Sequence, residues 1–239
     1  MMKNHNNSDI NHSKLCKWLL LIVLTTVAWF PMSSIALSCE NGVRSPKFAQ
    51  LLATIVRQLG DVTCEKAESF IDYVDGFSQD IQNNFELIAS DKTSNSRKKD
   101  LVKDTVNNYF DSPTSTVQTS SLNRPDFIRH HAVERYLKNL AKLSQTKYVT
   151  VKLEYDKDYF NMGNIEYEYE DGRKIYSFKV NMWAMFEGCT ESGRCYRDHT
   201  KKGFYMKLQT NRMRVDFVSV EDTVTEEDYR KLQRRWTRD

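Results

Sequence analysis

The chain has 239 residues, of which 35 are basic and 32 are acidic. Its net charge of +3 lacks the basic excess of nucleic-acid-binding domains, so the composition argues against a nucleic-acid partner. The small numbers of glycine and proline, and the lack of any repeated or low-complexity segment, argue against disordered and repeat proteins. The length suits one domain with its own core.

The first 38 residues have the three parts of a secretory signal. Lys3, Lys14 and Lys17 precede an uncharged apolar run over residues 18–30, and small residues follow it. A membrane-spanning helix needs about 20 apolar residues, so this run is short for an uncleaved anchor, which is the alternative. We expect a signal peptide over residues 1–38 and export of the rest, which holds 32 basic and 31 acidic residues.

Export would place the cysteines in an oxidising compartment, where thiols pair. Cys189 and Cys195 flank a polar loop with glycines between two predicted strands, which predicts a disulfide across a hairpin. A zinc site that adds His199 is not favoured. Four residues of extended strand would hold Cys195 and His199 about 13 Å apart, too far for both to bind one ion.

Cys39 and Cys64 leave two alternatives open. The two cysteines can form a second disulfide, or Cys39 can become the first residue of the mature chain and carry a lipid. The segment ALSC is a poor match to a lipoprotein box, because Ala36 stands where that box normally has a leucine. Both alternatives imply export, and membrane contact is expected only through a lipid anchor at Cys39.

The first part of the chain is expected to be mostly helical. Its apolar side chains recur every three to four residues, which predicts amphipathic helices. The predicted helices are residues 45–59, 64–89, 98–110 and 126–143, with a short strand at 116–122. Ser45 and Pro46 suit the start of the first helix, and Pro125 suits the start of the last.

Near residue 145 the spacing of apolar residues changes to every second position, which predicts strands. The predicted strands are residues 147–155, 164–170, 173–188, 196–210 and 212–220. Short turns between them indicate an antiparallel meander. A short helix is expected over residues 225–236. Its basic residues could touch an anionic surface, but packing of its aromatic residues onto the domain is favoured.

Helices followed by an antiparallel sheet define an α+β domain. The element order and the segments FIDYVDGFSQDIQNNF, YFDSPTSTVQTSSLNR, KYVTVKLEY and KIYSFKVNMWAMF resemble the nuclear transport factor 2-like superfamily in its secreted bacterial versions. The resemblance implies a cone, in which N-terminal helices pack on a curved antiparallel sheet. The resemblance covers about residues 64–220, and the domain that it implies is expected over residues 63–222. Residues 39–62 would add an extra N-terminal helix, and residues 223–239 a short C-terminal helix or tail.

Members of this superfamily either bind other molecules or catalyse reactions in the cone cavity with an Asp or His base. His130 and His131 lie in the helix predicted after Pro125, and one of them could act as a base near neutral pH. A surface histidine pair is favoured, because a base needs an enclosed pocket and a partner. The sequence has no nucleophile elbow, glycine-rich phosphate loop or His-Glu-x-x-His motif, so we expect no metal and no cofactor.

The sheet face opposite the predicted core carries unusual apolar residues. Trp183, Met185, Tyr205 and Val218 occupy this face, and such a patch is typical of a surface that binds another protein. In the resembling superfamily this face commonly pairs two copies. We expect a homodimer interface or another docking surface here. The alternative is that the N-terminal helix or the tail covers the patch.

We therefore expect an exported, non-catalytic binding or scaffolding domain of the bacterial cell envelope or periplasm. Its partner would be another protein or a second copy, and a small ligand is compatible with the fold. The alternative is a hydratase or isomerase whose base is His130 or His131. An open cavity with a buried titratable group is required for the enzyme, and a fully packed cone would rule it out.

Overall fold

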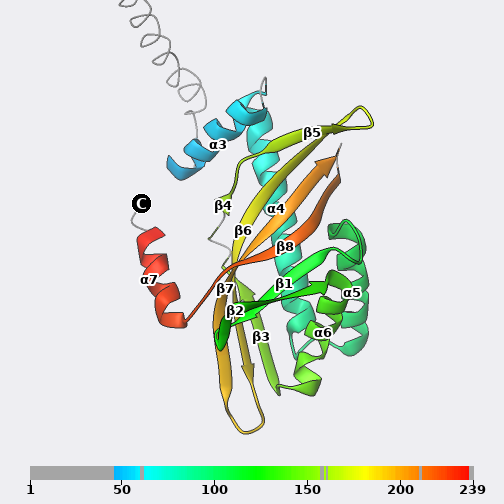
Figure 1. Ribbon diagram of the computed structural model, residues 1–239, viewed down its shortest axis with the longest axis vertical. Helices are drawn as coiled ribbons and strands as arrows, with labels where there is room; N and C mark the ends of the chain where they lie inside the picture. The colour runs from blue at the N-terminus through cyan, green and yellow to red at the C-terminus, as the bar shows by residue number, and fades with distance from the viewer. Residues whose placement is uncertain (1–45, 60–61, 157–158, 160, 210–211, 237–239) are drawn as a thin grey trace, which may run out of the picture.

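The computed structural model describes residues 46–59, 62–156, 159, 161–209 and 212–236. The predicted signal peptide and the predicted lipid-anchor residue Cys39 lie outside this part. Within it, the chain forms five helices and eight strands. It has an α+β fold, in which helices pack on a curved, unclosed sheet (Figure 1).

Most predicted helices are present with similar bounds. They are α3 (Pro46–Leu59), α4 (Cys64–Ala89), α5 (Asn95–Tyr109), α6 (Val133–Thr146) and α7 (Glu226–Trp236). The hydroxyl of Thr63 caps α4, and that of Ser94 caps α5 by accepting from the backbone N–H of Arg97. This cap starts α5 earlier than its apolar pattern indicates. Of the helices in the described part, none combines the length and apolar character needed to cross a membrane.

The sheet contains the predicted meander and one parallel pair. Its strands are β1 (Thr116–Ser121), β2 (Arg124–Ala132), β3 (Thr150–Tyr155), β4 (Asn161–Met162), β5 (Glu166–Glu170), β6 (Arg173–Cys189), β7 (Cys195–Gln209) and β8 (Arg212–Val224). The order is β2-β1-β8-β7-β6-β3, and β4 and β5 also pair with β6. Strands β5 to β8 follow one another antiparallel, whereas β1 joins β8 in parallel.

The helix predicted over residues 126–143 is wrong in its first half. Residues 124–132 form β2, which is antiparallel to β1 with His130 opposite Gln118, and α6 begins only at Val133. Pro125 fits both structures, because a proline suits the first turn of a helix or a strand at the edge of a sheet. β2 is such an edge strand. The exposed side chain of Ile128 shows that the apolar helical stripe starts later than predicted.

Helices α4, α5 and α6 lie on one face of the sheet and form the core with it (Figure 1). The predicted inner face of β6 is confirmed, since Phe178, Val180, Met182 and Ala184 are all buried in this core. Alternate side chains of a strand point to the same face, so these residues share one side of β6. The same alternation holds on β7, where Phe204 and Met206 are buried in the core.

A β-bulge reverses part of the predicted pattern in β8. Asp216 lies between Val215 and Phe217, which pair with adjacent residues of β7, so the register shifts by one residue there. Beyond the bulge, Val218 points into the core and is 0% exposed, while Phe217 contacts Tyr205 with ring centroids 5.3 Å apart. Val218 therefore faces the core and not the outer sheet face on which the interface was predicted.

Helix α7 lies on the opposite side of the sheet (Figure 1). Two of its aromatic residues pack against Trp183. The ring of Trp183 lies 5.2 Å from that of Tyr229 and 5.9 Å from that of Trp236, measured between centroids. Trp183 lies on the outer face as predicted, but it is only 3% exposed because α7 covers it. Met185 is half-buried and Tyr205 is 39% exposed, which leaves no continuous apolar patch among the four predicted residues.

Candidate functional site

A pocket of about 580 Å³, which we call the cone pocket, opens between α6 and the sheet. Its apolar lining consists of Tyr136, Leu140, Leu143, Tyr148, Leu153, Ala184 and Phe186. Its polar lining consists of Thr119, Ser120, Ser121, Asn123, Lys147, Thr190, Arg194, Cys195, Tyr196, Asp198, Thr200 and Lys202. An apolar wall with a small number of buried polar groups is typical of small-molecule sites.

Strand β7 supplies the buried charges of this pocket. Asp198, Thr200 and Lys202 are two residues apart, so they project from the same face of the strand. That face continues into the core residues Phe204 and Met206. Asp198 is 6% exposed and Lys202 is 7% exposed, which is unusual for charged residues, because burial removes them from water.

The Lys202 ammonium group has little compensation from the protein. Its Nζ donates to the backbone carbonyl of Gln118 at 3.1 Å and lies 5.8 Å from the ring centroid of Tyr136. The salt bridges found among the described residues do not include Lys202. Burial lowers the pKa of Lys202 to about 8, although the charge of Asp198 acts in the opposite direction.

The Asp198 carboxylate has one strong partner. The hydroxyl of Tyr196 donates to Asp198 Oδ2 at 2.5 Å, and the backbone N–H of Leu122 donates to that hydroxyl at 3.0 Å. Burial raises the pKa of Asp198, while the hydrogen bond from Tyr196 and the charge of Lys202 oppose the rise. Burial also raises the pKa of Tyr136 to about 12, so this phenol stays protonated at neutral pH.

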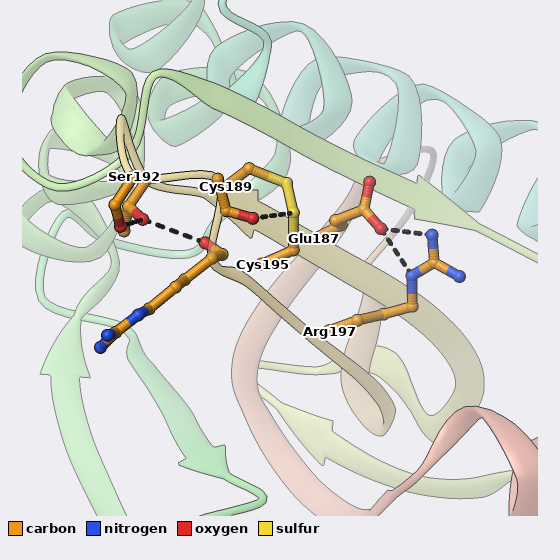
Figure 2. The surroundings of a disulfide bond; sticks show 8 residues. Glu187, Cys189, Ser192, Cys195 and Arg197 are labelled. Carbon is orange, nitrogen blue, oxygen red and sulfur yellow. Dashed lines mark hydrogen bonds and ion pairs between the residues drawn. A yellow bond between two sulfur atoms is a disulfide. The ribbon is translucent and has the colours of Figure 1, made fainter.

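The hairpin between β6 and β7 forms one rim of the pocket. The predicted disulfide is present and joins the two strands next to the turn of this hairpin. Cys189 and Cys195 face each other across the hairpin and are bonded, with their Cα atoms 4.0 Å apart (Figure 2). Gly193 has a φ of 78°, a conformation that glycine adopts without strain, so it suits the turn. Nε of Arg197 donates to Glu187 at 2.7 Å and adds a cross-strand ion pair (Figure 2).

The predicted histidine site lies elsewhere. His130 and His131 belong to the edge strand β2, and neither is among the residues that line the pocket. Nε2 of His131 lies 3.3 Å from the hydroxyl of Thr119, and its pKa is lowered first by burial and then by nearby cations such as Arg135. His130 is exposed. The histidine pair therefore lies outside the lining of this pocket.

The pocket residues were missed although the sequence held a signal for them. Phe204, Met206 and Leu208 indicate the inward face of β7, and the same alternation extended backwards includes Lys202 and Asp198. Charged residues at inward positions are informative, because burial of a charge needs compensation. The remaining walls come from α6, β1, β3 and β6. No local pattern shows that these elements approach β7.

A second hollow of about 580 Å³ lies between α5 and α6. Four lysines on its rim are exposed: Lys99, Lys103, Lys138 and Lys142. Lys98 is buried, but it donates to the carbonyl of Ala141 and to the hydroxyl of Ser144, both at 3.2 Å, so it joins the two helices. Water screens exposed charges strongly, which makes the cone pocket the better candidate site.

Two further observations concern the possible second disulfide and metal binding. Cys64 is disulfide-bonded, and its partner lies outside the described residues, as does Cys39. In the part of the chain that the structure describes, no three His, Cys, Asp or Glu side chains are grouped closely enough to hold a metal ion.

Known proteins are similar to this chain in structure only. No family model matches the sequence, and no curated protein matches it. A scytalone dehydratase-like protein from Novosphingobium aromaticivorans is 10% identical, with a TM-score of 0.38, and the match covers 68% of this chain and 91% of that one. Aln2 from a Streptomyces species is 11% identical, with a TM-score of 0.36, and the match covers 64% of this chain and 91% of that one.

A nuclear transport factor 2-like superfamily protein from Salmonella enterica is also similar. It is 10% identical, with a TM-score of 0.33, and the match covers 64% of this chain and 95% of that one. The name of this Salmonella protein is that of the superfamily that the sequence resembles.

Proposed function

We propose that this chain is a binding protein that holds a small ligand in the cone pocket. The observation that carries the proposal is the burial of Asp198 and Lys202 in the lining of an open pocket. Charged groups are rarely buried without a salt bridge, and convergent polar groups in an apolar cavity are typical of ligand sites. A fully packed cone would have argued for a purely structural role.

We propose that this binding protein works in the cell envelope. The Cys189–Cys195 disulfide is compatible with an exported protein, because such bonds persist in oxidising compartments. The signal peptide and a lipid at Cys39 remain predictions from the sequence. The covering of Trp183 by α7 removes the support for a dimer through the outer sheet face, so we place the binding function in the cone.

A catalytic role is the second candidate, and the buried titratable pair favours it. Asp198 or Lys202, rather than a histidine, would exchange a proton with the bound molecule. Binding is preferred because the hydroxyl of Tyr196 already donates to the Asp198 carboxylate. Conversion of a bound compound, followed by NMR over hours and lost in Asp198→Asn, would favour the catalytic candidate.

The binding function is tested by titrating small aromatic compounds and mapping backbone amide shifts by NMR. We expect the shifts to cluster on α6, β1, β7 and the β6–β7 hairpin. Leu143→Trp replaces an aliphatic side chain of the pocket wall by a bulky indole ring and should weaken binding. Tyr169→Trp, on the exposed strand β5, should not. Shifts outside the pocket, or binding that ignores Leu143→Trp, would contradict the proposal.

A further inference from the structure

We propose that the ligand of the cone pocket is an amino acid, a small zwitterion whose carboxylate meets Lys202 and whose ammonium group meets Asp198. The inference rests on the proposed function, because it requires that the pocket hold a ligand. It adds the chemical class of that ligand. Three features of the pocket carry it: two buried opposite charges, their unused hydrogen-bonding capacity and an adjacent apolar wall.

Both charged groups can accept more partners. A lysine ammonium group has three N–H donors, and Lys202 has one hydrogen bond, to Gln118. A carboxylate offers about four acceptor sites, and the hydroxyl of Tyr196 is the donor found for Asp198 in the described part of the chain. Both residues are more than nine-tenths buried and line the same pocket. A bound group of opposite charge would replace the water that each has lost.

A zwitterion suits the pair better than a simple acid or amine. Asp198 and Lys202 are not joined by any salt bridge found among the described residues, although each acts on the pKa of the other. A ligand with one charge would leave a net charge in a medium of low dielectric constant. A ligand with both charges leaves none and satisfies both groups. At pH 7 Lys202 remains mainly cationic, since its pKa is about 8.

The rest of the lining indicates what the amino acid carries. Leu140, Tyr148 and Phe186 form an apolar wall beside the charged pair. Burial of an apolar side chain against such a wall stabilises the complex, because it removes apolar surface from water. The volume of about 580 Å³ lies within the range of ordinary small-ligand sites and accommodates an aromatic side chain. We therefore infer a free amino acid with an apolar side chain.

Isothermal titration calorimetry at pH 7, on protein produced from the full chain, tests this assignment with three matched compounds. Phenylalanine has both charges, 3-phenylpropionate lacks the ammonium group, and 2-phenylethylamine lacks the carboxylate. We expect phenylalanine to bind at least tenfold more tightly than either. Lys202→Met should abolish its advantage over 2-phenylethylamine, and Asp198→Asn should abolish its advantage over 3-phenylpropionate. Lys201→Met, a neighbouring lysine outside the pocket lining, is the matched control and should leave all three affinities unchanged.

The outcomes separate this inference from the function on which it rests. Three results would each overturn the amino-acid assignment. They are equal affinity of the wild type for the three compounds, equal weakening of all three compounds by both variants, and no binding of any of the compounds. Neutral aromatic compounds that still shift pocket residues in NMR spectra would then leave the binding function intact. Circular dichroism and thermal unfolding of each variant confirm that it is folded.

Discussion

At the scale of single residues, Lys202 links the pocket to stability. Its folded-state pKa, about 8, lies below the ordinary value of 10.5, so the folded chain releases this proton at lower pH than the unfolded chain does. Between these pH values the unfolded state binds more protons, and the free energy of unfolding rises with pH. Below pH 8 both states are protonated, and the folded state bears the full cost of burying the charge.

We predict that loss of the Lys202 proton raises the free energy of unfolding by up to about 3 kcal/mol as the pH increases from 8 to 10.5. Urea unfolding of the wild type and of Lys202→Met, measured at unit steps from pH 7 to 10, checks this value. Other lysines and tyrosines titrate in the same range, so the informative quantity is the difference between the two proteins. A difference that does not change with pH would contradict the buried, weakly compensated ammonium group.

Gly188 shows how a residue without a side chain shapes the pocket. A Cβ added to Gly188 would lie 2.8 Å from three atoms of the Tyr148 ring, which lines the pocket. We predict that Gly188→Ala lowers the free energy of unfolding by about 1–3 kcal/mol, because the ring must move. Gly76→Ala is the control. It lies within α4 with no atom within 4 Å of the added Cβ, so it should stabilise by up to about 1 kcal/mol. Urea unfolding that places both variants on the same side of the wild type would refute this reading.

At the scale of elements, the β6–β7 hairpin depends on its disulfide. The bond joins residues six apart in sequence, and such a small loop stabilises by about 2 kcal/mol through restriction of the unfolded chain. We predict a loss of about this size in the double variant Cys189→Ser and Cys195→Ser. The ion pair of Arg197 with Glu187 should keep the strands paired. Chemical unfolding of both proteins, with Cys64 left intact, measures the loss, and equal stabilities would show that the bond is dispensable.

Sequence patterns predicted long elements well and the β1–β2 hairpin poorly. Helix α4 and strand β6 have many turns or alternations, so one residue out of pattern changes little. The segment 124–132 is short, polar and mostly exposed. Its few apolar residues fit either a helix or a strand. Pairing with β1 decides between the two, and a contact between segments is not visible in the local pattern.

At the scale of the whole molecule, long-range pairing builds the pocket. The parallel contact of β1 with β8 joins Val117 to Val218, and it places Gln118 beside Lys202. A residue 84 positions away in the sequence therefore contacts the Lys202 ammonium group. The inward position of Lys202 can be read from strand alternation, although it was not predicted, whereas its partners depend on the fold. Sequence alternation thus indicates which side of β7 faces the pocket, but it does not indicate which other residues line the pocket.

Helix α7 explains why the sequence suggested an interface on the outer sheet face. That face carries Trp183, as predicted, but Tyr229 and Trp236 of the same chain cover it. The bulge at Asp216 also turned Val218 into the core. Coverage by a terminal helix satisfies the same physical need as a partner, because both remove apolar surface from water.

We predict that removal of α7 turns this covered face into a binding surface. A chain that ends at Val224 exposes Trp183, and burial of a large aromatic side chain contributes several kcal/mol of driving force for association. Light scattering after size-exclusion chromatography should show concentration-dependent self-association of the truncated chain and a monomer for the intact one. Adding Trp183→Glu to the truncated chain should restore the monomer, because a charge on this face opposes burial. A truncated chain that stays monomeric at high concentration would mean that the bare sheet face does not self-associate.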